Sequence, residues 1–430
     1  MPTPSLLIVP ARFKTGRLYS QIPTSGAGDF TVTRNTEARR FNSAGLLESV
    51  ASGIPRLDYY TSGGTAGCPA LLVEPAATNL SFNSADFTAS GTWTSGANTI
   101  SANVTATLDP AGTNTAEKII PTAVSTTHFI SSVQSIAITS GTTYTLSVFA
   151  KAGGYDFLRV AFSTEIMPAS NRGASFNLTS GTVGDTQAGV TARIENYGNG
   201  WYRCSISRAA TISATPSSPF FFNSQNSDSA TSVTFTGDGT SGAFLWGAQL
   251  ETGSVATSYI PTTAGTGSRS ADVISVSGAV SGSIGQTEGT IYAEVDLKNK
   301  GVSLSRVIYL SDGTSNNEIR ISHSVTTAGD LQIAIRLAGS LVVNQTSPTA
   351  VYFGINKIAV GYKVGTNEVV MYVNGSQIIL STSSGNMPAC NTIHLGSQLG
   401  TSNFLNDRIR AAALYTTRLT NAELATLTTP

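Results

Sequence analysis

The three histidines, His128, His323 and His394, are the side chains best suited to proton transfer or metal binding near neutral pH. Each lies inside a strand-like run, and none has a second His or Cys at the spacing of metal ligands. Serine is so frequent that a Ser-His-Asp match carries no weight, and the G-x-S-x-G elbow of serine hydrolases is absent. We therefore expect structural or surface roles for all three histidines.

The three cysteines, Cys68, Cys204 and Cys390, are far apart and form no C-x-x-C pair. An odd number at this spacing predicts neither a complete disulfide framework nor a zinc site. We expect buried, reduced thiols, as in a chain that is made and assembled in the cytoplasm.

Two further motifs contain the residue types of a binding loop but lack the structural context that such a loop needs. Gly237, Gly239 and Gly242 match the spacing of a dinucleotide fingerprint, but strand-like runs lie on both sides, where the motif needs a helix N-terminus for the pyrophosphate. The segment 312–318 (D-G-T-S-N-N-E) could offer oxygen ligands to Ca²⁺ but lacks the EF-hand arrangement. The sequence predicts a turn at the glycines and a polar hairpin at 312–318, with no cofactor or metal site and with calcium as the alternative.

The composition excludes some classes of partner. The chain has 25 basic and 25 acidic residues, so the basic excess that neutralises phosphates is missing and no nucleic-acid partner is expected. No run of 18 apolar residues occurs, so we expect no membrane insertion. The 42 glycines, together with abundant Ser and Thr and few helical patterns, favour strands, hairpins and loops.

These elements predict an all-β protein with two tandem antiparallel β-sandwich (jelly-roll) domains. Residues 1–80 show little periodicity, and we expect an extended N-terminal arm for anchoring or docking. Short strands at turn-marked intervals predict a jelly roll over 81–263. Residues 264–287 are rich in Gly, Ser and Thr and are expected to be a linker that contains at most one short strand. A second strand series predicts another sandwich over 288–430.

Two local signals mark the second sandwich. Asn374-Gly375 lies between two strand-like runs and predicts a tight hairpin. Thr420 and Glu423 form a capping box, which predicts one short C-terminal helix of one or two turns.

Several phrases resemble bacteriophage tail and head-spike fibre proteins. Residues 33–80 contain T-R-N-T-E-A-R-R-F-N-S-A-G-L-L-E, I-P-R-L-D-Y-Y and L-L-V-E-P; G-N-G-W-Y-R-C follows at 198–204, L-W-G-A-Q-L-E-T-G at 245–253 and S-Y-I-P-T at 258–262. The resemblance covers about 33–262. It implies a jelly roll similar to carbohydrate-binding modules, carried on a virion.

The last part of the chain resembles concanavalin/laminin-G-type sandwiches over about 287–429. The phrases are G-T-I-Y-A-E-V, Y-V-N-G and A-A-L-Y-T-T-R-L-T-N-A-E-L. Glu294 and Asp296 match the start of the E-x-D-x-x-E pattern of concanavalin-like glycosidases, but position 299 is Asn, so the second glutamate that would protonate the leaving group is missing. We predict a strand edge with outward charges, no catalytic residue and no enzyme.

Sugar binding without catalysis would use exposed aromatic faces supported by amides and carboxylates. The candidate glycan-binding residues are Trp93, Tyr155, Tyr197 and Tyr202. Trp201 and Trp246 are expected to fill the sandwich core instead.

Three arginines stand close together near the N-terminus, in a chain with few charges. Arg34, Arg39 and Arg40 could dock the arm onto a partner protein. They could equally form ion pairs with acidic neighbours, which are Glu37, Glu48 and Asp58.

These observations predict a noncatalytic structural protein of a bacteriophage virion, a tail or head fibre or spike. It would be assembled in the host cytoplasm, contact other virion proteins, form a homo-oligomer (a trimer is favoured) and attach to host-surface glycans through linked weak sites. The alternatives are a purely architectural capsid or tail decoration protein and, disfavoured by the missing carboxylate, a polysaccharide-degrading spike.

Overall fold

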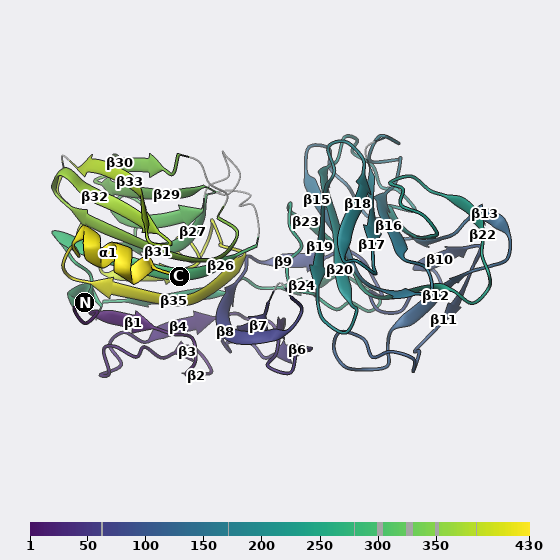
Figure 1. Ribbon diagram of the computed structural model, residues 1–430, viewed down its shortest axis with the longest axis horizontal. Helices are drawn as coiled ribbons and strands as arrows, with labels where there is room; N and C mark the ends of the chain where they lie inside the picture. Colours follow the sequence, from purple (N-terminus) through teal and green to yellow (C-terminus); the bar gives the residue numbers. More distant parts are fainter. Residues whose placement is uncertain are drawn as a thin grey trace.

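The computed structural model describes residues 1–61, 63–170, 172–278, 280–298, 304–323, 330–348, 352–383 and 385–430. Position 299, where the glycosidase pattern fails, lies outside them. Figure 1 shows two β lobes side by side along the long axis, with both chain ends in one lobe. The predicted all-β class, with antiparallel sheets and one short C-terminal helix, is confirmed.

The lobe without the chain ends, here called the inserted sandwich, has two six-stranded sheets. The first is β10 (Trp93–Gly96), β14 (Phe129–Ser132), β21 (Phe220–Gln225), β16 (Phe157–Phe162), β17 (Gly173–Asn177) and β18 (Thr182–Thr186) in spatial order. The second is β11 (Asn98–Ser101), β12 (Glu117–Pro121), β23 (Gly242–Thr252), β15 (Thr143–Gly153), β20 (Tyr202–Ala209) and β19 (Thr191–Asn196). A ribbon of β13 (Ser125–Thr127) and β22 (Thr234–Thr236) lies at the far end.

The other lobe, here called the composite sandwich, also has two sheets. One is β33 (Ser376–Ser383), β32 (Gly365–Val373), β31 (Gly354–Lys363), β26 (Glu288–Leu297), β35 (Asp407–Tyr415), β8 (Ala66–Val73) and β7 (Leu57–Tyr60), with β1 (Leu6–Ile8) also paired to β35. The other is β2 (Phe13–Lys14), β3 (Arg17–Leu18), β4 (Phe30–Thr33), β25 (Val273–Ser277), β34 (Thr392–Leu395), β27 (Ser305–Ser311), β28 (Glu318–His323), β29 (Leu331–Leu337) and β30 (Ser340–Thr346). A 3₁₀ turn spans Ser281–Ser283.

The first 80 residues belong to the composite sandwich, so the prediction of an extended arm is wrong. Leu6 pairs with Leu414, Leu71 pairs with Ile409, and Leu6 and Phe30 lie in the same apolar core as the C-terminal strands. The sequence does alternate apolar and polar residues in these strands. In F-T-V-T of β4, for example, Phe30 and Val32 are buried and the two threonines are exposed. Strands this short gain stability only from partners far along the chain, so their local pattern is weak.

Residues 264–287 also differ from the predicted linker with at most one short strand, because two strands form there. β24 (Gly267–Arg269) pairs with β9 (Ala77–Asn79), and β25 lies between β4 and β34 within a sheet. The chain therefore leaves the composite sandwich along β9 and returns along β24. The inserted sandwich is formed by the residues between these two strands (Figure 1).

The local signals of the second strand series are confirmed. Asn374 and Gly375 join β32 to β33 with positive φ of 50° and 83°, as a type I′ turn requires. Thr420 and Glu423 form both bonds of the capping box of α1 (Asn421–Thr428), and Leu424 packs onto the sheet beside Ala359. In the described part of the chain, no helix is long and apolar enough to span a bilayer.

Substitution of a buried N-terminal residue should destabilise the composite sandwich. We expect Phe30→Ala to lower the free energy of unfolding by about 3–5 kcal/mol, because a fully buried ring leaves a cavity. Phe13→Ala, at a ring that is 36% exposed, is the matched control and should change it by about 1 kcal/mol or less. Urea denaturation measures both, and equally small effects would restore the picture of a separate arm.

A candidate binding cleft at the junction of the two sandwiches

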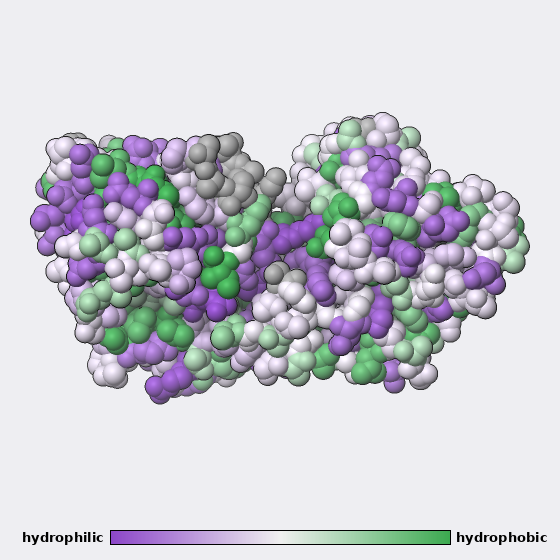
Figure 2. Space-filling view, viewed as in Figure 1, coloured by the Kyte–Doolittle hydropathy of each residue, from purple (hydrophilic) through white to green (hydrophobic). Residues whose placement is uncertain are grey.

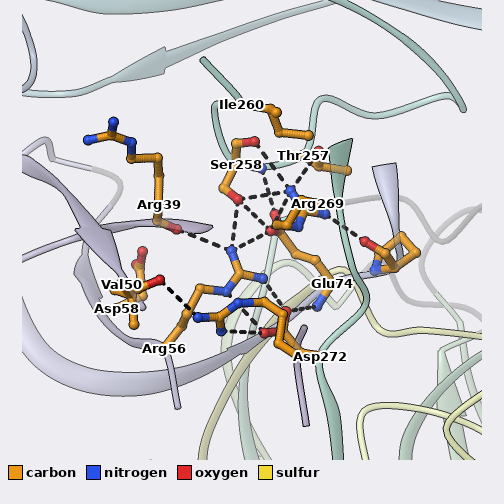
Figure 3. Close-up of polar contacts among 12 residues, drawn as sticks. Arg39, Val50, Arg56, Asp58, Glu74, Thr257, Ser258, Ile260, Arg269 and Asp272 are labelled. Carbon is orange, nitrogen blue, oxygen red and sulfur yellow. Dashed lines mark hydrogen bonds and ion pairs between the residues drawn. The ribbon is translucent and has the colours of Figure 1, made fainter. Parts of the chain in front are cut away.

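A buried network of ions holds the base of the junction (Figure 3). Arg56 donates to both oxygens of Asp272, with Nε 3.2 Å from Oδ1, and its Nη1 lies 2.6 Å from Oε2 of Glu74. Arg269 lies 3.2 Å from the same oxygen of Glu74, and Arg34 lies 3.1 Å from Asp272. All five side chains are almost completely buried, so each charge depends on the others.

The network reaches the inserted sandwich through the segment that follows β23. The backbone N–H of Ser258 donates to Glu74 at 2.7 Å, and its hydroxyl donates to the other carboxylate oxygen at 2.6 Å. Burial would raise the pKa of Glu74, but Arg269 and Arg56 outweigh it and hold that pKa well below its usual range. Glu74 therefore stays ionised and ties the two lobes together.

Arg34 is not available for docking, because it is buried. Besides Asp272, it donates to the backbone carbonyl oxygens of Thr36, Ile54 and Ala51. Its partner is thus distant in sequence rather than one of the three neighbouring acids.

The other two arginines follow the pairing hypothesis more closely. Arg40 donates from Nε to Glu48 at 2.7 Å, and Arg39 lies 3.9 Å from Glu37. Asp58, the third predicted acid, accepts instead from Arg408 at 2.6 Å. Docking of a partner through Arg39 or Arg40 stays a prediction.

Aromatic side chains form the second part of the junction. Phe41 and Tyr60 of the composite lobe pack in one cluster with Phe149, Trp201 and Trp246 of the inserted lobe. Both tryptophans are buried as predicted, but they lie in this cluster between the lobes rather than in the core of the inserted sandwich.

Above this base, a pocket of about 470 Å³ opens between the lobes. Its lining comes from β19 (193–196) on one side and from the ends of β7, β26, β31 and β35 on the other. In Figure 2 the surface is hollowed between the lobes, and hydrophilic residues gather there. The pocket is within the size range of ligand sites in proteins, about 300–1,000 Å³.

Lys298 is the most unusual group in this pocket. Its Nζ lies 3.0 Å from the ring centroid of Tyr60 and 3.5 Å from Oε1 of Glu195 on the other lobe. Burial lowers the pKa of Lys298 to about 7, with a further contribution from Arg408. Burial would raise the pKa of Glu195, but Arg193 and Lys298 are among the cations that outweigh it and lower that pKa to about 2.

The opposite wall of the pocket is apolar and exposed. Phe353 is 43% exposed and directly precedes β31, and Ile355, the second residue of β31, is 55% exposed. Next to them, Arg410 donates from Nε to Glu294 at 2.7 Å. β26 is a central strand, so the prediction that Glu294 and Asp296 mark a strand edge is wrong; Glu294 is paired, and Asp296 lines the pocket.

A second pocket of about 410 Å³ adjoins the first, and the two share Asn196. Turn residues line it, together with Tyr202: Ala44, Gly45, 63–66, Asn196 and 198–200. A Cβ on Gly198 would lie 2.4 Å from the carbonyl oxygen of Gly64, so the hairpin tips of the two lobes touch at glycines.

The aromatic candidates divide into two groups. Tyr202 lines the second pocket, and Tyr197 lines a small cavity of about 40 Å³ at the junction. Trp93 is buried in the core beside Phe87, which contradicts its expected role as an exposed platform. Tyr155 packs on Phe235 of β22, at the far end of the inserted lobe.

Sequence reasoning missed the residues that form most of the cleft. Tyr60, Lys298, Phe353 and Arg410 come from four strand ends that the sheet brings together. Tyr60 lies in the phrase I-P-R-L-D-Y-Y that carried the fibre resemblance, but nothing local distinguishes the other three.

The histidines lie inside the sandwiches. The ring nitrogens of His128 lie 2.7 and 3.0 Å from the carbonyl oxygens of Ala97 and Phe235. His323 is buried, and burial lowers the pKa of His394 to about 4.

Two of the three thiols are buried, as expected. Cys204 and Cys390 are buried, but the expectation of a buried thiol is wrong for Cys68, which is exposed on β8. None of the described residues forms a group of three His, Cys, Asp or Glu side chains that could hold a metal.

The two predicted loops form as expected. Gly237 and Gly239 lie between β22 and β23, Gly242 begins β23, and this connection contains no helix. Asp312 accepts from Thr314 and Asn317 in a polar hairpin between β27 and β28. Calcium at that hairpin stays a prediction.

No protein-family model and no curated protein match this chain. Solved structures give weak similarities. The IT-sialidase CBM40 of Ruminococcus gnavus is 16% identical, over 33% of this chain and 83% of that one, with a TM-score of 0.29; another structure of it holds α2,3-sialyllactose. The NanB sialidase of Streptococcus pneumoniae is 19% identical over 36% of this chain and 27% of that one, with a TM-score of 0.31. The SAP-like pentraxin of Limulus polyphemus is 13% identical over 32% of this chain and 68% of that one, with a TM-score of 0.25.

Breaking the buried network should loosen the junction. We expect Arg56→Met to lower the free energy of unfolding by about 3–5 kcal/mol, because Glu74 and Asp272 lose a buried partner. Arg40→Met removes a more exposed pair and should cost about 1 kcal/mol or less. Urea denaturation compares the two, and a similar small loss for both would contradict a role for the network.

Lys298 should make stability depend on pH. Its pKa is about 7 in the folded protein and about 10.4 when unfolded, so the unfolded chain binds more protons between these values and stability rises with pH there. We expect Lys298→Met to be more stable than the parent at pH 7, by roughly 4 kcal/mol, with the advantage shrinking toward pH 10. Denaturation at several pH values tests this; a difference that stays constant with pH would contradict it.

Proposed function

We propose that this protein is a noncatalytic adhesion protein that binds a glycan in the cleft between its two sandwiches. The observation that carries the proposal is the pocket of about 470 Å³, which combines the exposed apolar surface of Phe353 and Ile355 with charged groups from both lobes and the amide of Asn196. Sugars present apolar C–H faces and a rim of hydroxyl groups, so this mixture of surfaces suits them.

The residues of the cleft can be assigned complementary roles. Phe353, Ile355 and Tyr202 offer apolar or aromatic surface, whereas Asn196 and Asp296 offer hydrogen-bonding groups. Asn196, Tyr202, Asp296 and Ile355 sit on strands of two packed sandwiches, so their positions are largely fixed before a ligand arrives, which reduces the entropy lost on binding.

The charges at the cleft support binding rather than hydrolysis. A glycosidase needs a carboxylic acid that is protonated near neutral pH, and this requires a raised pKa. In the cleft lining, Glu195 is shifted the other way: burial opposes its ionisation, but neighbouring cations outweigh it and lower its pKa to about 2. Glu195 therefore has no proton to donate near neutral pH.

The setting that we propose is a bacteriophage virion, as a tail or head fibre or spike, and it rests on the phrases in 33–262. In a homo-oligomer, with a trimer favoured, weak cleft sites would act together, because later contacts become intramolecular after the first one forms. Other virion proteins would anchor the assembly, and the host-surface glycan would be its target.

Removing ring surface from the cleft should weaken glycan binding. We expect Tyr202→Ala and Phe353→Ala each to raise the Kd about tenfold, or about 1.4 kcal/mol. Tyr155→Ala, on the far end of the inserted lobe, is the control and should leave it unchanged. Glycan arrays and host-cell binding identify the ligand, and calorimetry measures the Kd of each variant for it.

Two outcomes would contradict the proposal. If the intact assembly enriches on no bacterial glycan or host cell, the protein is architectural. If it releases sugar with turnover, it is an enzyme.

A further inference from the structure

Three cations line the larger pocket from both lobes. Arg193 comes from β19, Lys298 follows β26, and Arg410 lies in β35, whereas the carboxylates in the same lining are Glu195 and Asp296. Arg193 lies 3.5 Å from Glu195, and Arg410 pairs with Glu294, so cations and carboxylates are equal in number around the pocket. The case for an anionic ligand therefore rests on how incompletely Lys298 and Arg410 are paired. The second pocket differs, because the described residues that line it include no charged side chain.

Lys298 rests its Nζ on the ring of Tyr60, 3.0 Å from the centroid, and has few oxygen acceptors besides. Within the described residues, Glu195 is the carboxylate in ion-pair range of its Nζ, at 3.5 Å, which is longer than a direct charge-assisted hydrogen bond. An ammonium group has three donors, and this side chain is only 11% exposed, so water replaces the missing partners poorly. A ligand oxyanion in the pocket would supply them.

Arg410 has guanidinium surface directed to the same space. Its bond to Glu294 uses Nε, and its side chain is 24% exposed where it lines the pocket. A planar guanidinium can hold a carboxylate with two parallel N–H···O bonds, so a second carboxylate can bind while Glu294 keeps its contact.

We propose that the cleft selects a saccharide that carries a carboxylate, and that Lys298 and Arg410 are the residues that recognise this group. The proposal rests on the glycan-binding function proposed above and adds its ligand class. The acidic sugar occupies the larger pocket, which contains Lys298 and Arg410. A neutral sugar next to it in the same chain occupies the uncharged pocket beyond Asn196.

The test uses polysaccharides whose carboxylates can be masked without removing the sugar. The intact protein is applied to an array of acidic bacterial polysaccharides before and after methyl esterification, at about pH 6, below the pKa of Lys298. We expect esterification to weaken binding at least tenfold, and added salt to weaken the binding of the unmodified glycans.

Variants locate the recognition in the pocket. We expect Lys298→Met and Arg410→Met each to lower the affinity for the acidic glycan about tenfold and to leave the binding of its ester unchanged. Lys363→Met is the matched control, because Lys363 is 51% exposed on β31 and pairs with Glu288 outside the cleft. Thermal unfolding confirms that each variant is folded.

The outcomes separate this inference from the function on which it rests. If acidic and esterified glycans bind equally well, the acidic-ligand inference is overturned while glycan binding stands. If Lys298→Met and Arg410→Met bind the acidic glycan as tightly as Lys363→Met does, the carboxylate is recognised elsewhere and the assignment is overturned. If no glycan binds in either form, both proposals fail.

Discussion

The pairing of Arg56 with Asp272 and Glu74 is the interaction on which the rest of the structure depends. These residues stand where the chain passes between the lobes: Arg56 before β7, Glu74 after β8 and Asp272 before β25. A charge buried this deeply is tolerated only with its partners in place, so the network permits one arrangement of these three chain segments. The cleft needs that arrangement, because Glu195 and Lys298, which approach each other across it, belong to different lobes.

The sequence predicted the features that depend on near neighbours. The turn at Asn374-Gly375 and the capping box of Thr420 and Glu423 form as expected, because all the groups involved lie within a few residues. The alternation of apolar and small polar residues over 144–149 indicated a half-buried strand; β15 forms there, but it is buried on both faces.

Features that depend on distant partners could not be predicted in the same way. Leu6 is recognisable as a core residue only once it is paired with Leu414. Arg34 was expected to form an ion pair with an acid nearby in the sequence, whereas its partner is Asp272. The cleft was found only in part. Tyr197 and Tyr202 lie near it because the turn between β19 and β20 reaches the other lobe, but Lys298 and Arg410 become neighbours only through the sheet.

The insertion between β9 and β24 has a consequence for how such a protein can diversify. The two strands pair with each other, so the chain leaves and returns at adjacent points, and every strand of the composite sandwich's two sheets lies outside the inserted segment. The buried network is likewise built by Arg34, Arg56, Glu74, Arg269 and Asp272, while the inserted lobe adds contacts such as those of Ser258. A different module with closely spaced ends, offering hydroxyl and amide donors to Glu74, could replace this one by recombination. The exchange would renew one wall of the cleft while the other wall and the scaffold were inherited unchanged.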